Sequence, residues 1–278
     1  MNLPNGTKLQ SGKYKIRETL GNGGFGFTYL AEHCFTGQKV AIKELFVNRR
    51  CTRLPHSARV VWPIGLNGFF YWMNTKSDFL HEVNTLWKLR QSHIVHVMDA
   101  FEENNTVYFV MEYLNGKTLR TILKEQGALP EEKAVKHIKQ VAKGLVYLHR
   151  KHRYHLDIKP ENIIIGHRGY AYIIDFGACI HVHSDDNTYD HNFQYTKHFA
   201  PKEVQERDNV TEASDVYSLG ATLYNLLTNT KPADAIDRMN GKEKISVQFI
   251  GTHVGWCESS FISAKRDADG KVIKVIHT

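Results

Sequence analysis

The first part of the chain alternates apolar and polar residues in short runs, and this period of two is typical of β-strands. Five such runs, separated by turn residues, cover residues 14–20, 27–32, 39–45, 94–101 and 106–113. Between the third and fourth runs, Phe79, Val83, Leu86 and Leu89 recur at helical spacing, and Ser77 or Asp78 is available as an N-cap. The pattern predicts a five-stranded antiparallel sheet with one helix.

Residues 47–77 show neither period. The stretch is interrupted by Pro55, Pro63, Gly65 and Gly68, and the aromatic run 69–72 is expected to be exposed. The sequence predicts a loop-like insertion here.

Beyond Gly116 the apolar period becomes helical. Pro130 suits a first helical position, and an apolar stripe runs from Ala134 to Leu148. Two apolar runs, 163–165 and 171–174, indicate a hairpin, and residues 213–227 are apolar almost all round, as in a helix buried on every side. The second part is therefore expected to be mainly helical, which makes the fold class α+β.

Composition narrows the class of protein. With 278 residues, of which 42% are hydrophobic and 23% charged, the chain is long enough for one large domain or two modest lobes. It has no apolar run of membrane-spanning length, no signal-peptide pattern at residues 1–10, and no CxxC pair among its four cysteines. These features predict a soluble cytoplasmic protein without disulfides or a cysteine zinc site.

The positive charge is concentrated near the start. Residues 1–100 hold 13 Lys and Arg against 6 Asp and Glu, whereas the remainder balances at 23 against 23. Part of the excess is a cluster of Arg49, Arg50, Arg53 and Arg59, which could meet nucleic acid or an acidic partner. No aromatic stacking platform interleaves with these arginines in the sequence, which favours a solvated basic loop and no nucleic acid.

Several polar residues and glycines recur in patterns that suit phosphate chemistry. Gly21, Gly23 and Gly26 lie between two predicted strands, where backbone N–H groups could approach phosphate oxygens. A dinucleotide site would need a helix after these glycines, but a β-type run follows. Lys43 lies in a predicted strand, a loop at 155–162 holds Asp157, Lys159 and Asn162, and Asp175 precedes Phe-Gly. Each could be an ordinary surface or turn residue, but their joint occurrence by chance is improbable.

Taken together, these motifs resemble those of the eukaryotic-type protein kinase family, over roughly residues 10–240. The glycine loop, Val-Ala-Ile-Lys43, His155-Leu-Asp-Ile-Lys-Pro-Glu-Asn162, Asp175-Phe-Gly and Asp215-Val-Tyr-Ser-Leu-Gly220 occur in the family's order. The chain looks most like bacterial serine/threonine kinases of the Bacteroidetes type. The resemblance implies a two-lobed fold, with an N-lobe at about 10–113 and a C-lobe at about 114–240.

The resemblance also implies roles for the motif residues. Lys43 would hold the α- and β-phosphates of ATP, and Glu82 would fix Lys43, although Glu82 could be an ordinary helix residue. Asp157 would accept or orient the substrate hydroxyl, and Lys159 would neutralise the moving phosphate. Asn162 and Asp175 would hold Mg²⁺. Lys159 and Thr196 resemble serine/threonine rather than tyrosine kinases.

The adenine pocket follows from the same resemblance. Leu20, Thr28, Ala41 and Ile164 would line it, with Met111 at the back and the backbone of Glu112 and Leu114 at the base edge. Each of these residues could equally be plain core.

Three departures from the family's pattern stand out. Leu156 replaces an arginine common before the catalytic aspartate, Ala-Pro-Glu is shifted so that only Glu203 aligns, and nothing after Asn240 matches the last helices or the arginine that normally pairs with Glu203. The C-lobe is therefore expected to be truncated. Residues 241–278 predict strands at 245–250, 256–264 and 271–277, which faintly resemble the closing hairpin of a PAS sensor domain.

The segment after Asp-Phe-Gly holds His181, His183, His191 and His198 near three aspartates, where a metal site competes with a solvated activation segment. The expected function is ATP- and Mg²⁺-dependent phosphorylation of serine or threonine in protein substrates. A catalytically weak nucleotide-binding scaffold and a small-molecule phosphotransferase remain the alternatives. The substrate, the activating signal and the oligomeric state do not follow from the sequence.

Overall fold

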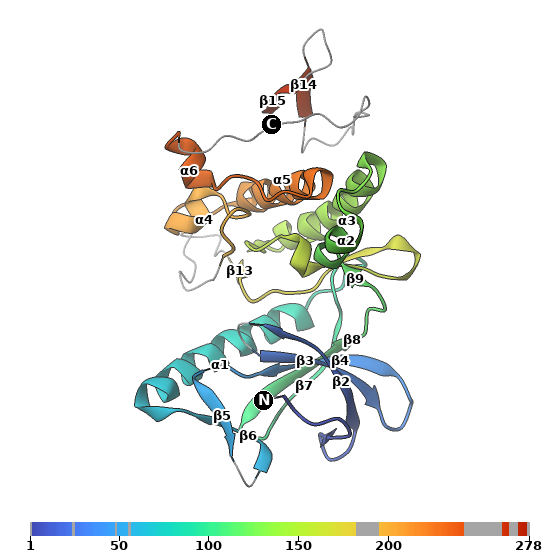
Figure 1. Cartoon of the computed structure of the whole chain (residues 1–278). Helices are drawn as coiled ribbons and strands as arrows, with labels where there is room; N and C mark the ends of the chain where they lie inside the picture. The colour runs from blue at the N-terminus through green and yellow to red at the C-terminus, as the bar shows by residue number, and fades with distance from the viewer. Residues whose placement is uncertain are drawn as a thin grey trace. The chain divides into compact units, whose positions relative to one another are not determined.

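The structure is a computed structural model (Figure 1) that describes residues 2–23, 26–47, 49–54, 57–181, 195–241, 263–266 and 272–276. The chain divides into two compact units, Met1–Asn115 and Gly116–Thr278. No helix among these described residues is long and apolar enough to cross a membrane.

An antiparallel sheet forms the first unit, with strand order β1-β2-β3-β4-β8-β7. Its strands are β1 (Lys8–Leu9), β2 (Tyr14–Gly23), β3 (Gly26–His33), β4 (Lys39–Leu45), β7 (Val97–Glu103) and β8 (Thr106–Glu112). All five predicted strands are confirmed, and the short β1 adds a sixth at the edge. Apolar residues of β3, β4 and β8 are buried, so these strands form the middle of the core.

The predicted loop at 47–77 is wrong. It holds a hairpin, β5 (Cys51–Leu54) with β6 (Ser57–Pro63), and the first half of a long helix, α1 (Gly65–Trp87), which runs along the sheet in Figure 1. Ser77 and Asp78 are interior residues of α1, not caps. The four consecutive aromatics hid the period because only one of them, Trp72, points inward. The buried face is formed by Trp72, Thr75, Phe79, Val83 and Leu86.

A buried ion pair fastens the β5–β6 hairpin to the sheet. Arg53 Nη2 donates to Glu44 Oε2 over 2.7 Å, and the two side chains are 2% and 0% exposed. The hydroxyls of Tyr29 and Tyr108 donate to the same carboxylate over 2.6 and 2.8 Å. Burial lowers the pKa of Arg53, but the Glu44 carboxylate outweighs it and the net pKa is raised.

The expectation of a solvated basic loop is therefore wrong for Arg53. Arg50 is exposed, and its guanidinium also lies 4.2 Å from the ring centroid of Tyr71 in α1. Arg49 and Arg59 are exposed, as predicted.

Helices dominate the second unit, as predicted. They are α2 (Leu119–Gln126), α3 (Glu131–His149), α4 (Lys202–Glu206), α5 (Glu212–Thr228) and α6 (Ala235–Met239), and α3 packs on α5. Thr211 and Ser214 form a capping box at the start of α5. From Ser214 to Thr228 no residue of α5 is exposed, which confirms the buried helix.

Short strands complete this unit. The predicted hairpin is confirmed as β11 (Ile163–Ile165) with β12 (Ala171–Ile173), and β9 (Lys117–Thr118) pairs beside it. Near the end, β14 (Ser263–Arg266) pairs with β15 (Val272–Ile276), which fits parts of the strands expected at 256–264 and 271–277. The strand expected at 245–250 lies outside the described residues.

Candidate active site

Three side chains converge on Asp157, in the loop between β10 (Arg153–Tyr154) and the single turn η1 (Pro160–Asn162). Lys159 Nζ and Asn162 Nδ2 donate to Asp157 Oδ2 over 2.5 and 2.9 Å. Thr196 Oγ1, 39 residues further along the chain, donates to Asp157 Oδ1 over 2.6 Å and accepts a bond from Lys159 Nζ at 2.6 Å. The loop thus brings together the three predicted residues and adds a threonine hydroxyl.

The side chain of Asp215, in α5, holds this loop by binding the loop's backbone N–H groups. Its carboxylate is fully buried and accepts bonds from the N–H groups of His155 and Leu156 over 2.9 and 2.8 Å. His149, at the end of α3, places Nε2 2.8 Å from the same carboxylate. These bonds stabilise Leu156 at φ 62°, a left-handed backbone that few residues other than glycine adopt. Two helices therefore fix the shape of the loop before Asp157.

The Leu156 side chain is part of a hydrophobic cluster. It is 1% exposed and packs with residues that precede and follow residues 182–194 of the sequence, namely Ala178, Ile180, Ala200, Val204 and Val210. In addition, β13 (Ile180–His181) pairs with β10, the strand just before the loop. Leucine at this position therefore contributes apolar packing where the resembled family often has a charged donor.

The β11–β12 hairpin brings the two predicted metal ligands close in the backbone, because Ile174 N–H donates to the carbonyl of Asn162 over 3.0 Å and Asp175 follows directly. The next residue, Phe176, is buried with its ring centroid 4.8 Å from that of His155. Burial lowers the pKa of His155, so its imidazole is held neutral.

The donor chemistry at Asn162 and Asp175 fits magnesium. Asn162 directs its amide nitrogen to Asp157, which leaves its oxygen as the donor for a cation. Two hard oxygen donors suffice, since Mg²⁺ is commonly held by one or two protein groups together with phosphates and water. Within the described residues, no group of three or more His, Cys, Asp and Glu could hold a metal ion. Of the histidines considered for a metal site, His183 and His191 lie outside those residues.

In the first unit, the predicted glycines lie on the β2–β3 hairpin, whose residues 24–25 are outside the described residues. Gly26 is required by packing, because a Cβ at its φ of 151° would lie 1.8 Å from the carbonyl oxygen of Glu44. A Cβ on Gly21 would meet nothing within 4 Å. The packing of the protein therefore does not require a glycine at position 21.

Lys43 lies on β4, paired with Thr28 of β3 and Phe109 of β8. Its Nζ is 5.8 and 5.5 Å from the ring centroids of Phe79 and Phe109, so it is on the face of the sheet that α1 covers. Glu82 lies in α1, three residues after Phe79, but its side chain is outside what the structure describes. The Lys43–Glu82 pair stays a prediction.

The predicted adenine-pocket residues are divided between the units. Ala41 is buried between Leu30 and Met111 in neighbouring strands, while Leu20 is 44% exposed. Glu112 N–H donates to the carbonyl of His96 over 3.0 Å, so this group is already used within the protein. Leu114 is half-buried, and Ile164 lies on β11 of the second unit.

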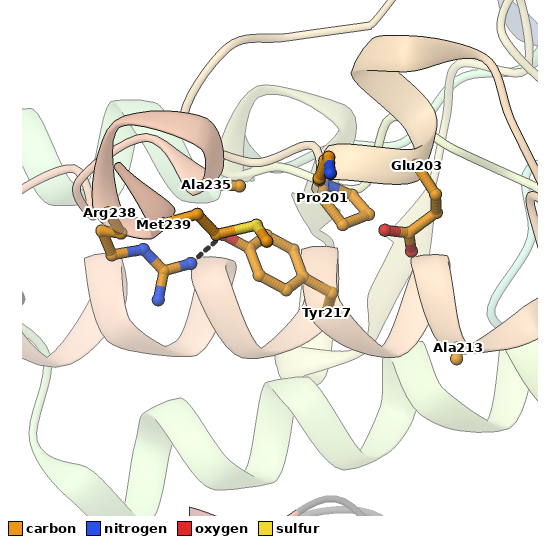
Figure 2. A pocket seen from close by; sticks show the side chains of 8 residues that line it. Pro201, Glu203, Ala213, Tyr217, Ala235, Arg238 and Met239 are labelled. Atoms are coloured by element: carbon orange, nitrogen blue, oxygen red, sulfur yellow. Dashed lines mark hydrogen bonds between the residues drawn. The ribbon is translucent and has the colours of Figure 1, made fainter. Parts of the chain in front are cut away.

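A pocket of about 460 Å³ lies between α4, α5 and α6 (Figure 2), and none of its lining residues is a predicted catalytic residue. Glu203 Oε1 accepts from Ser214 Oγ over 2.8 Å, and Arg238 donates to the Tyr217 hydroxyl. Figure 2 shows Glu203 and Arg238 on opposite sides of Tyr217. The Glu203 carboxylate, for which the sequence offers no match to the family's arginine, therefore accepts a hydrogen bond from a serine of α5.

Comparison with known families identifies the family of the chain as a whole. A model of the protein kinase domain matches residues 14–268. The chain belongs to the protein kinase family. The solved kinase-like structure described as "PpkA-294 apo form" aligns with a TM-score of 0.73 at 23% identity, covering 87% of this chain and 84% of that one. The two-lobed kinase fold predicted from the sequence is confirmed.

Curated relatives include both bacterial and eukaryotic kinases. The chain is 31% identical over 82% of its length to serine/threonine-protein kinase PrkC of Bacillus subtilis, and 31% identical over 82% to the Aurora kinase of Schizosaccharomyces pombe. It spans only 32% of the Bacillus kinase and 58% of the yeast one.

Sequence reasoning named Thr196 and Asp215 but did not predict the contacts that they make at the loop. The contact of Thr196 with Asp157 crosses 39 residues, so no local pattern shows it. The bond between His149 and Asp215 joins two helices, so the motif that contains Asp215 does not indicate His149 as its partner.

Proposed function

We propose that this kinase domain transfers the γ-phosphoryl group of ATP to serine or threonine hydroxyls of protein substrates. The observation that carries the proposal is the contact of Thr196 with both Asp157 and Lys159. This contact supports the proposal because one aliphatic hydroxyl donates to the carboxylate and accepts from the ammonium at the same time. A substrate serine or threonine presents the same group.

The chemistry follows from charge and position. Asp157, only 15% exposed, accepts the proton of the substrate hydroxyl or orients that hydroxyl toward the phosphate. Lys159 Nζ, which lies 2.5 Å from Asp157 Oδ2, offsets the negative charge on the transferred group. Asn162 holds Asp157 through two bonds, which limits its rotation.

The remaining predicted residues are proposed to bind the nucleotide. Lys43 contacts the α- and β-phosphates with Glu82 as its partner, and backbone groups beside Gly21, Gly23 and Gly26 contact the phosphate chain. Leu20, Thr28, Ala41, Met111, Glu112, Leu114 and Ile164 surround the adenine. A magnesium ion bound by Asn162 and Asp175 supplies positive charge to the phosphates.

The test is a phosphotransfer assay on the purified chain with labelled ATP, Mg²⁺ and two sets of peptides, one with serine or threonine and one with tyrosine as sole acceptor. We expect label on the first set only. Asp157→Asn should lower the rate by about 100-fold or more while nucleotide affinity, measured with a fluorescent ATP analogue, stays within about twofold.

An Asp157→Asn chain with undiminished activity would exclude the proposed role of that residue. Nucleotide binding without transfer in the parent chain would support the nucleotide-binding scaffold instead. Label on a small-molecule alcohol but on no peptide would support the phosphotransferase alternative.

A further inference from the structure

An apolar surface occupies the end of β6 and the first turns of α1. We call it the aromatic patch and define it by side chains between 49% and 79% exposed, namely Trp62, Ile64, Leu66, Phe69, Phe70 and Met73. Scattered exposed apolar residues are normal on proteins, but six within twelve positions of one surface segment are not.

The patch lies on a separate face of α1 from the core. Leu66, Phe69, Phe70 and Met73 follow the spacing i, i+3, i+4, i+7, which places them on one side of the helix. Trp72 and Phe79, 4% and 3% exposed, lie on the side that packs inward. The amino-terminal part of α1 therefore has two apolar faces, and only one of them is covered.

The surroundings of the patch are positively charged. Residues 46–77 include five Lys and Arg and no Asp or Glu. Two of the five are neutralised inside the unit, Arg53 by Glu44 and Lys76 by Glu102. Arg49, Arg50 and Arg59 are exposed.

Two contacts place the turn that holds Arg49 and Arg50 beside the patch. Ile64 N–H donates to the carbonyl of Arg50 over 2.8 Å, and the Arg50 guanidinium lies 4.2 Å from the ring centroid of Tyr71. Cationic and apolar groups are therefore parts of one surface, which is the combination found in helices that lie in the interface of anionic membranes.

We propose that the aromatic patch and Arg49, Arg50 and Arg59 bind the surface of an anionic lipid bilayer, with the patch inserted at the level of the headgroups. An acidic peptide would match the charge equally well, but Leu66 and Phe70 are 79% and 66% exposed, so they project from the surface instead of lining a groove. Projecting side chains suit insertion between lipids. The proposal does not depend on phosphotransfer.

The test uses the full chain and sucrose-loaded vesicles, either of phosphatidylcholine alone or with about one quarter phosphatidylglycerol. We expect sedimentation with the anionic vesicles only, weakened at 0.5 M salt. Trp62 emission should shift to shorter wavelength on binding, and the shift should be absent in Trp62→Phe.

Matched variants separate the patch from general surface effects. Phe69→Ser/Phe70→Ser should weaken partitioning at least tenfold, because two inserted rings are lost. Phe35→Ser, at a position 94% exposed in the same unit but outside the patch, should leave it unchanged. Each of Arg49→Gln and Arg59→Gln should cost about fivefold, whereas Lys39→Gln, an exposed charge elsewhere, should cost less than twofold.

Three results would overturn the proposal: equal binding to neutral and anionic vesicles, equal partitioning of Phe69→Ser/Phe70→Ser and the parent, or no vesicle binding. Sedimentation velocity without vesicles supplies a fourth. If the parent self-associates and Phe69→Ser/Phe70→Ser does not, the patch is an interface between copies of this chain. Unchanged melting temperatures establish that the variants are folded, which is expected because all substituted side chains are exposed.

Discussion

Replacing Arg53 by methionine should destabilise the first unit far more than the loss of an ordinary arginine. Methionine keeps much of the volume but removes the charge, and Glu44, whose side chain is 0% exposed, would retain the hydroxyls of Tyr29 and Tyr108 as its partners among the described residues. Leaving one member of a buried ion pair without its partner costs about 3–5 kcal/mol. The bond from Arg53 Nη1 to the carbonyl of Arg59, 2.5 Å, is lost as well. This is a large part of the roughly 5–15 kcal/mol that stabilises a typical domain.

Urea unfolding of the full chain, followed by circular dichroism, measures the loss for Arg53→Met, for Glu44→Gln and for the double variant. The carboxylate that makes Arg53→Met costly is absent from the double variant. We therefore expect the double variant to be at least about 1.5 kcal/mol more stable than the sum of the two single losses predicts. Arg17→Met is the control, since its ion pair with Glu32 has side chains 47% and 32% exposed and should contribute at most about 1 kcal/mol.

The reasoning fails if Arg53→Met costs no more than Arg17→Met, or if the two single losses add within about 0.5 kcal/mol. Either result would mean that Glu44 finds water or another donor when Arg53 is removed.

Four further outcomes are expected. Asp175→Ala should weaken ATP binding in the presence of Mg²⁺ but not in EDTA, and an unchanged magnesium titration would remove Asp175 from the metal site. Thr196→Val should reduce phosphotransfer about tenfold or more, while Thr196→Ser should keep most of it, because only serine retains the hydroxyl between Asp157 and Lys159. Equal phosphotransfer rates in Thr196→Val and the parent would argue against a role for that contact. Burial lowers the pKa of His155 below its ordinary value of about 6.5, so the folded state binds fewer protons than the unfolded state. The stability that the neutral imidazole gives above about pH 6.5 should therefore be lost as the pH falls. The melting temperature of His155→Gln should depend less steeply on pH between about 5 and 7 than that of the parent. Because Leu156 offers no donor to a phosphate, phosphatase treatment, checked by mass spectrometry, should change activity by less than about tenfold, and a larger fall would mean that another residue binds an activation-segment phosphate.

Local sequence patterns predicted correctly the elements in which apolar residues repeat at one regular spacing. The strands of the main sheet and the helices α3 and α5 are of this kind, since one apolar period decides each. The kinase motifs added the candidate residues of the loop around Asp157, which the structure brings together. The pairing of Lys43 with Glu82 remains a prediction.

The missed features depend on partners that the local pattern does not contain. Arg53 belongs to an apparently hydrophilic stretch, and only the folded hairpin shows that its charge is buried against Glu44. In the same way, residues 65–76 were not predicted as helical because their apolar residues serve two faces, one toward the core and one toward the aromatic patch, and two overlapping stripes erase the period.

The buried bond between Arg53 and Glu44 also limits how this chain can be rebuilt. Surface insertions of similar length are usually removable, because the ends of a loop can be joined without exposing or burying charge. Excising the β5–β6 hairpin here would leave a carboxylate in the middle of the sheet, so a shortened chain needs a neutral residue at position 44 at the same time. Grafting the hairpin onto another kinase domain requires the reverse, an acidic residue next to the lysine of its β4 equivalent. Positions 44 and 53 therefore have to be changed together, and sequence variation at either is expected to be accompanied by variation at the other.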